Sequence, residues 1–191
     1  MIGPQPRPSN PAAAGFTVVE LLVTVAVIGI VAGTAFTVSQ TSWRREQANA
    51  AAESLYAWLQ EVVRRPEQIG SSCTVTVNTG SLAPGAVLAT VAPTTCAGES
   101  SLRLPAINQQ DNYAVAVNPS TSASWVFTPR GAIALTTGTS SSSAAIEIRL
   151  SLNNNVPVRC IRVSGTLGLL SMGRNNTTGD TTTACNQWDA L

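Results

Sequence analysis

The strongest constraint in this sequence is an apolar stretch that continues directly into an amphipathic one. From Val18 to Val38 there are 21 positions, of which Glu20 is the only ionisable one. As a helix this stretch is roughly 30 Å long, which is enough to cross the hydrocarbon core of a bilayer. It predicts a membrane-spanning helix, for which the general alternatives are a cleaved signal peptide and a plain N-terminal anchor.

The amphipathic part has apolar residues at three- and four-residue steps, which is the spacing of a helix packed along one face. Pro66 predicts the end of that helix, because the residue before a proline is disfavoured in helical conformation. We therefore expect one helix of roughly 50 residues, with a transmembrane half over 16–38 and an amphipathic half over 39–66. The apolar stripe consists of Ala48, Ala51, Ala52, Leu55, Tyr56, Leu59, Val62 and Val63.

The composition excludes several classes of enzyme and metalloprotein. Charged residues make up only 11% of the chain, His is absent, and all 11 basic residues are Arg. Without His or Lys there is no His-based triad, no His-ligated metal, no Schiff-base lysine and no phosphate-loop lysine. We expect no catalytic residue, no metal and no cofactor. The formal net charge of +1 indicates neither nucleic acid nor an acidic surface as a partner.

From Ser71 onward the sequence is rich in Thr, Ser, Gly, Ala and Val, with short alternating runs separated by turn-forming residues. A long helix followed by an antiparallel β-sheet head over 71–191 gives an α+β fold. Asn153–Asn155 predicts a turn, and the low-complexity stretch at 136–143 predicts a hairpin loop. Strands are expected over 73–77, 86–91, 113–117, 124–127, 145–152, 158–163 and 167–170.

The residues that open the apolar stretch, Gly15-Phe16-Thr17-Val18-Val19-Glu20-Leu21-Leu22-Val23, resemble the processing and methylation motif of type IV pilins and type II secretion pseudopilins. The resemblance implies that 1–15 is a leader, that a prepilin peptidase cleaves between Gly15 and Phe16, and that Phe16 is N-methylated. It also implies that Glu20 serves filament assembly by pairing with the N-terminal amine of a neighbouring subunit. The alternative for Glu20 is a carboxylate that reaches the membrane interface near the helix end.

Two segments of the β-rich head resemble the GspH/FimT-like branch of minor pilins. Trp125–Gly131 is similar to its Phe-x-Pro-x-Gly turn, and Arg159–Ser164 to the strand before its C-terminal Gly-Arg turn. The resemblance implies a minor structural subunit in the cytoplasmic (inner) membrane, with a periplasmic or extracellular head. Its implied partners are other pilin or pseudopilin subunits, the prepilin peptidase and the inner-membrane assembly platform. The alternative outside this family is a membrane-anchored β-domain that never polymerises.

DNA binding is the alternative function within this branch. Some FimT-like pilins bind DNA through a C-terminal Gly-Arg-x-Arg element, of which Gly173-Arg174 matches the first half. A DNA site would rest on Arg149, Arg159, Arg162 and Arg174, and the other interpretation of these arginines is a solvated strand face.

The cysteines indicate disulfides. All four follow the apolar stretch, in the part of the chain expected to reach an oxidising compartment, and their spacing matches no C-x-x-C motif. Of the three connectivities, we favour the sequence-local pairs Cys73–Cys96 and Cys160–Cys185; the alternative is that Cys160 is a buried free thiol. Each pair closes a loop of about 20–25 residues, which stabilises the folded chain by on the order of 3 kcal/mol.

Overall fold

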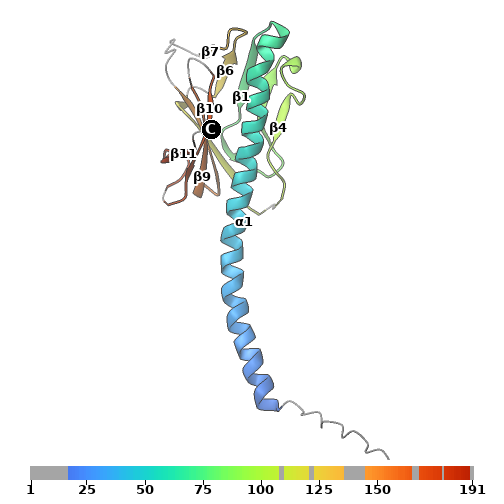
Figure 1. Cartoon of the computed structure of the whole chain (residues 1–191), viewed down its shortest axis with the longest axis vertical. Coiled ribbons are helices and arrows are strands. Elements are labelled where there is room, and N and C mark those ends of the chain that lie inside the picture. Colours follow the sequence, from blue (N-terminus) through green and yellow to red (C-terminus); the bar gives the residue numbers. More distant parts are fainter. Residues whose placement is uncertain are drawn as a thin grey trace, which may run out of the picture. The chain divides into compact units, whose positions relative to one another are not determined.

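The computed structural model describes residues 17–107, 110–120, 123–135, 145–164, 168–177 and 179–189, with the backbone alone over 34–41. One helix, α1 (Val18–Ile69), precedes a series of short strands (Figure 1). The chain divides into two compact units between Thr41 and Ser42, so the second half of α1 belongs to the same unit as the strands. The expected leader, Phe16 and the expected hairpin loop at 136–143 lie outside the described residues.

Helix α1 confirms the long helix that the sequence predicts, with 52 residues. Thr17 caps its start, where the Thr17 hydroxyl accepts a hydrogen bond from the Glu20 N–H at 3.3 Å. The expectation that Pro66 ends the helix is wrong, since the helix continues to Ile69. A proline removes one backbone donor and crowds the carbonyl four residues earlier, and here both effects fall in the last turn of the helix. It ends before Gly70, whose φ of 65° is the left-handed conformation that terminates many helices.

The described part of the chain contains no helix that is both long enough and apolar enough to count as a candidate membrane span.

Within the described residues the strands form two antiparallel sheets. The first has the order β4-β3-β1-β6-β7 and the second the order β11-β10-β9-β8-β5-β2. The first sheet comprises β1 (Cys73–Val77), β3 (Val87–Ala92), β4 (Ser101–Arg103), β6 (Ser124–Phe127) and β7 (Ile133–Leu135). The second comprises β2 (Gly80–Leu82), β5 (Tyr113–Asn118), β8 (Ile146–Leu152), β9 (Asn155–Val163), β10 (Leu170–Asn175) and β11 (Gln187–Asp189).

Most of the longer strands were predicted from the sequence, and the strand expected at 167–170 was placed wrongly. Strands β1, β3, β5, β6 and β8 agree with their predicted ranges to within one residue at each end, whereas β9 begins three residues earlier than expected, at Asn155. Strand β10 occupies Leu170–Asn175, so Gly173 and Arg174 lie in a strand rather than in a turn. The β8–β9 turn uses only Asn153 and Asn154, whose φ angles of 51° and 53° fit a two-residue hairpin loop.

The main core lies between the second half of α1 and both sheets. The predicted stripe is confirmed: its alanines, leucines and Val62 are buried, while Tyr56 and Val63 pack at its edge. Trp125 and Phe127 of β6 meet edge to face in this core, with ring centroids 6.3 Å apart. The second sheet contributes alternate residues of β5, β8 and β9, among them Val115, Ile148, Leu150 and Ile161.

Strand β8 is unusual for an antiparallel strand because all seven of its residues are buried. Ile146, Ile148, Leu150 and Leu152 face the main core. The alternate residues Glu147, Arg149 and Ser151 point to the other face of the second sheet and are buried there as well. Some other part of the chain must therefore cover that outer face.

Candidate functional sites at the helix start and on the second sheet

The start of α1 is the first candidate site. Thr17 and Glu20 have the spacing of an N-terminal helix cap, and a carboxylate in the first turn is favoured by the positive end of the helix dipole. Gly15 and Phe16, the predicted processing residues, lie outside the described residues. The large apolar side chains of α1 between Leu21 and Val31 are exposed, and an apolar surface of this extent normally contacts lipid or other protein. They are Leu21, Leu22, Val23, Val25, Val27, Ile28, Ile30 and Val31.

The two disulfides are the second feature, and their partners are those that the local spacing favours. Cys73 of β1 bonds Cys96, the last residue of the short 3-10 helix η1 (Thr94–Cys96), with a Cα–Cα distance of 5.8 Å. Cys160 of β9 bonds Cys185 with a Cα–Cα distance of 6.1 Å, so Cys160 is not a free thiol. The second bond ties the chain after β10 to the outer face of the second sheet.

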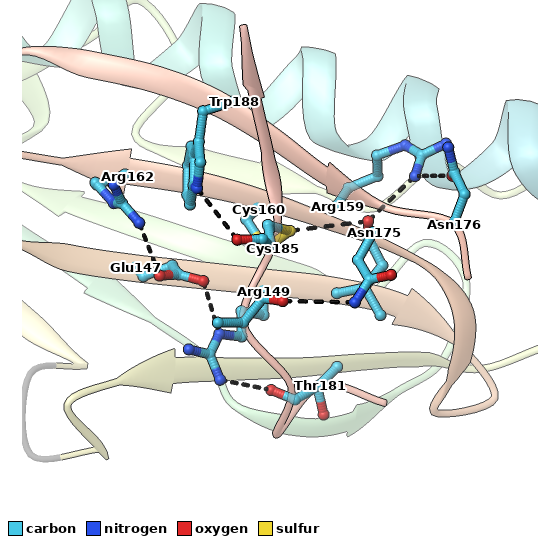
Figure 2. The surroundings of a disulfide bond; sticks show 12 residues. Glu147, Arg149, Arg159, Cys160, Arg162, Asn175, Asn176, Thr181, Cys185 and Trp188 are labelled. Carbon is cyan, nitrogen blue, oxygen red and sulfur yellow. Dashed lines mark hydrogen bonds and ion pairs between the residues drawn. A yellow bond between two sulfur atoms is a disulfide. The ribbon is translucent and has the colours of Figure 1, made fainter. Parts of the chain in front are cut away.

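The segment that covers this outer face comprises residues 179–189, which we call the C-terminal segment. Besides the disulfide, it presents the carbonyls of Thr181 and Thr182 to the Arg149 guanidinium, the nearer at 2.6 Å. The Asp180 carboxylate holds the local turn by accepting hydrogen bonds from the hydroxyl and N–H of Thr182, which lower the pKa of Asp180. Figure 2 shows Thr181, Cys185 and Trp188 of this segment around the charged residues of the sheet.

Beneath the C-terminal segment lies a group of three charged residues, which we call the charged layer: Glu147 and Arg149, which are buried, and Arg162, whose side chain is 38% exposed. The Arg149 guanidinium donates to the Glu147 carboxylate at 2.9 Å, and both side chains are 8% exposed. Arg162 reaches the other Glu147 oxygen at 3.6 Å from the solvent-accessible side. The two arginines and one carboxylate leave a net positive charge, which the threonine carbonyls partly compensate.

Trp188 and Gly173 complete this site. Trp188 was not predicted as a site residue, and Gly173 was expected only as part of a Gly-Arg turn. The Arg162 guanidinium lies 3.7 Å from the centroid of the Trp188 ring, a cation–π contact. Trp188 is paired with Gly173 across β10 and β11, and its ring covers the space where a Cβ on Gly173 would lie. The sequence could have indicated that Trp188 is packed against the fold, because it is a lone Trp in a polar C-terminal stretch and a large aromatic ring there needs apolar cover.

Arg159 and Arg174 lie on the opposite face of the second sheet from the charged layer. Arg159 pairs with Leu150 of β8 and with Arg174 of β10, so both arginines point to the side of α1. The Arg159 guanidinium donates to the Asn49 side chain of α1 at 2.6 Å and to the Asn176 side chain at 2.8 Å. The four arginines considered for DNA binding are therefore divided between two faces.

The solvated strand face proposed as the other interpretation is wrong for two of these arginines, since Arg149 and Arg159 are each 6% exposed. Burial follows from the C-terminal segment on one face and from α1 on the other. Among the described residues one cluster, Glu147 with Cys160 and Cys185, has donor atoms near enough to hold a metal ion. Its two sulfurs are bonded to each other and cannot act as thiolate ligands, so this cluster is not a metal site.

Comparisons with known proteins bear on the start of the chain. Residues 10–36 match the family model described as the prokaryotic N-terminal methylation motif. No curated protein and no solved structure gives a significant match. The matched range contains Gly15, Phe16 and Glu20, together with most of the exposed apolar residues of α1. The chain thus carries, at the start of its long helix, the signature of type IV pilins and pseudopilins, which are structural subunits.

Proposed function

We propose that this chain is a minor subunit of a pilus-like filament, either a type IV pilus or a type II secretion pseudopilus. The observation that carries the proposal is the methylation motif at residues 10–36, placed where α1 begins. The exposed apolar side chains of α1 support it, because a filament core or a bilayer would cover them. The resemblance of the β-rich head to the GspH/FimT-like branch favours a minor rather than a major subunit.

The proposed life cycle has a membrane stage and a filament stage. Prepilin peptidase cleaves between Gly15 and Phe16 and methylates Phe16, while the first half of α1 lies in the cytoplasmic membrane and the head lies on the outer side. The assembly platform then moves the subunit into the filament. A carboxylate in the bilayer costs about 2.5–3.5 kcal/mol. Pairing Glu20 with the Phe16 amine of a neighbouring subunit offsets that cost and sets the register between subunits.

DNA binding has no specific observation in its favour. Arg149 and Arg162 are paired with Glu147 on one face, and Arg159 and Arg174 lie on the other, so the four do not form one phosphate-binding row. Several such contacts on one surface are the usual basis of DNA affinity. A structural role in the filament is therefore the function that we propose.

Peptide mass spectrometry of the protein from its native membrane tests processing. We expect a mature N-terminus at N-methylated Phe16. An N-terminus at Met1, or one formed after the apolar stretch, would contradict the proposal and leave an anchored or secreted β-domain.

Substitution of Glu20 tests assembly. We expect Glu20→Ala to be processed normally and to be absent from filaments sheared from the cell. Glu67→Ala is the matched control, since Glu67 is an exposed carboxylate at the other end of the same helix and should leave incorporation unchanged. Normal incorporation of Glu20→Ala would favour the alternative in which this carboxylate only reaches the membrane interface.

A further inference from the structure

A second charged site lies on the α1 side of the second sheet, away from the charged layer. It is a pocket of about 310 Å³ between α1 and the strands β9 and β10. Three arginines line it: Arg45 from α1, Arg159 from β9 and Arg174 from β10. Glu53 is the one carboxylate in its lining, so the lining carries a net positive charge.

Arg159 is the buried member of this group, and its partners are neutral. Its guanidinium donates to the side-chain oxygens of Asn49 and Asn176 and to the Val158 carbonyl. Among the described residues no carboxylate lies within ion-pair distance of Arg45, Arg159 or Arg174. A buried guanidinium without an anionic partner is costly, so an anion at this position would be favoured.

The electrostatic environment of Arg159 agrees with this arrangement. Burial lowers the pKa of the Arg159 guanidinium, and the charges of Arg45 and Arg174 lower it further, whereas Glu46 raises it. The like charges therefore repel one another across the pocket. An anion bound between them would relieve that repulsion.

The hydrogen-bonding groups of the pocket are mostly donors. An arginine can only donate, so Asn49 and Asn176 must turn their oxygens to Arg159 and keep their NH₂ groups as donors for another acceptor. Arg174 uses its Nε to bond Gln187 at 3.0 Å, which fixes its side chain beside the pocket. Planar guanidinium groups match the paired oxygens of carboxylates and phosphates.

We propose that the pocket formed by Arg45, Asn49, Arg159, Arg174 and Asn176 binds a single oxyanion, a phosphate or a carboxylate group. This proposal is independent of filament assembly and stands on the geometry of the head. The two anions share the recognition chemistry, and they differ in source: a phosphate would come from a phosphorylated ligand, a carboxylate from an acidic side chain of another protein.

The test titrates the full chain, in a non-ionic detergent, with inorganic phosphate in one arm and acetate in the other, at constant ionic strength set with chloride. NMR of the arginine Nε–Hε groups reports the site directly. We expect saturable shifts of the Arg159 and Arg174 signals with at least one of the two anions. The arm that saturates at the lower concentration shows which of the two anion groups the pocket prefers.

Variants separate the site from general charge effects. Arg45→Gln and Arg174→Gln each remove one exposed charge from the pocket and should weaken binding roughly tenfold, as expected for one charge-assisted hydrogen bond. Arg130→Gln is the matched control, because Arg130 is exposed and does not line the pocket. The absence of saturation in both arms, or equal weakening by Arg130→Gln, would overturn the proposal.

Discussion

At the scale of single residues, the outer face of the second sheet depends on a few close contacts that a sequence pattern does not reveal. The Trp188 ring fits against the backbone of Gly173 and carries the Arg162 guanidinium on its face. Glu147 and Arg149 alternate with apolar residues along β8, which is the pattern of a half-exposed strand. They are buried only because a distant segment covers them, and no local pattern encodes that cover.

Gly173→Ala should therefore destabilise the head. A Cβ at this position would lie 2.7–2.9 Å from carbons of the Trp188 ring, so the ring must move and its contact with Arg162 must change. We expect a loss of about 1–3 kcal/mol in the free energy of unfolding, measured by chemical denaturation. Gly98→Ala is the control, since a Cβ added at Gly98 would lie no closer than 3.5 Å to its nearest neighbour, a Glu61 oxygen, and the φ of Gly98 is not positive. Equal losses in the two variants would contradict the packing argument.

Glu147→Gln tests the charged layer at its centre. The substitution keeps the shape and removes the charge that compensates Arg149 and Arg162, so we expect about 3–5 kcal/mol of destabilisation. The matched control is Glu61→Gln in the exposed pair with Arg65, where we expect less than about 1 kcal/mol. The free energy of unfolding of both variants decides the matter, and similar losses would mean that Glu147 is effectively solvated.

At the scale of elements, prediction succeeded where a period could be read over several turns or residues. Helix α1 and its apolar stripe followed from three- and four-residue spacing, and the longer strands from alternation. Strands β2, β4, β7 and β11 have three residues each, too few for an alternating pattern to be recognised. Strand β10 was misplaced because its polar sequence is held in the sheet by its neighbours, with Gly173 opposite Cys160 and Trp188.

The end of α1 was misplaced for a different reason, and it yields a prediction. Gly70, rather than Pro66, ends the helix through its left-handed conformation, and no atom lies within 4 Å of the Cβ position. Gly70→Ala should thus introduce backbone strain alone, with a loss of about 1–2 kcal/mol in the free energy of unfolding. Gly70→Asn should lose less, because Asn tolerates this conformation. A neutral Gly70→Ala would show that the helix end rearranges without cost.

At the scale of the whole head, the middle of the second sheet, at β8 and β9, is covered on both faces, by the main core on one and by the C-terminal segment on the other. The two disulfides stabilise different parts of the head. Cys73–Cys96 joins β1 to η1, with both cysteines fully buried, whereas Cys160–Cys185 fastens the outer cover. Their sequence separations of 23 and 25 are nearly equal, so their entropic contributions should be similar, on the order of 3 kcal/mol each.

Paired Cys→Ala variants distinguish the effects of the two disulfides on the C-terminal segment. Cys160→Ala with Cys185→Ala should expose the C-terminal segment to a non-specific protease between β10 and β11, because the covalent link to the sheet is lost. Cys73→Ala with Cys96→Ala should cost a similar free energy of unfolding and leave that segment protected. Limited proteolysis with mass mapping of the fragments distinguishes the variants. Identical cleavage patterns would show that non-covalent contacts alone hold the cover in place.

The charged layer also has a consequence for the order in which the chain is made. Synthesis proceeds from the N-terminus, so β8 and β9 are made before the residues that cover their outer face. Glu147 and Arg149 are buried only in the finished head, so they face water until Cys185 and Trp188 emerge, and charged side chains keep an uncovered sheet soluble. An apolar layer would pack as well in the finished head, but it would be prone to aggregate until the C-terminal segment covers it. Charged residues therefore suit a sheet face that is exposed to water before the last part of the chain covers it.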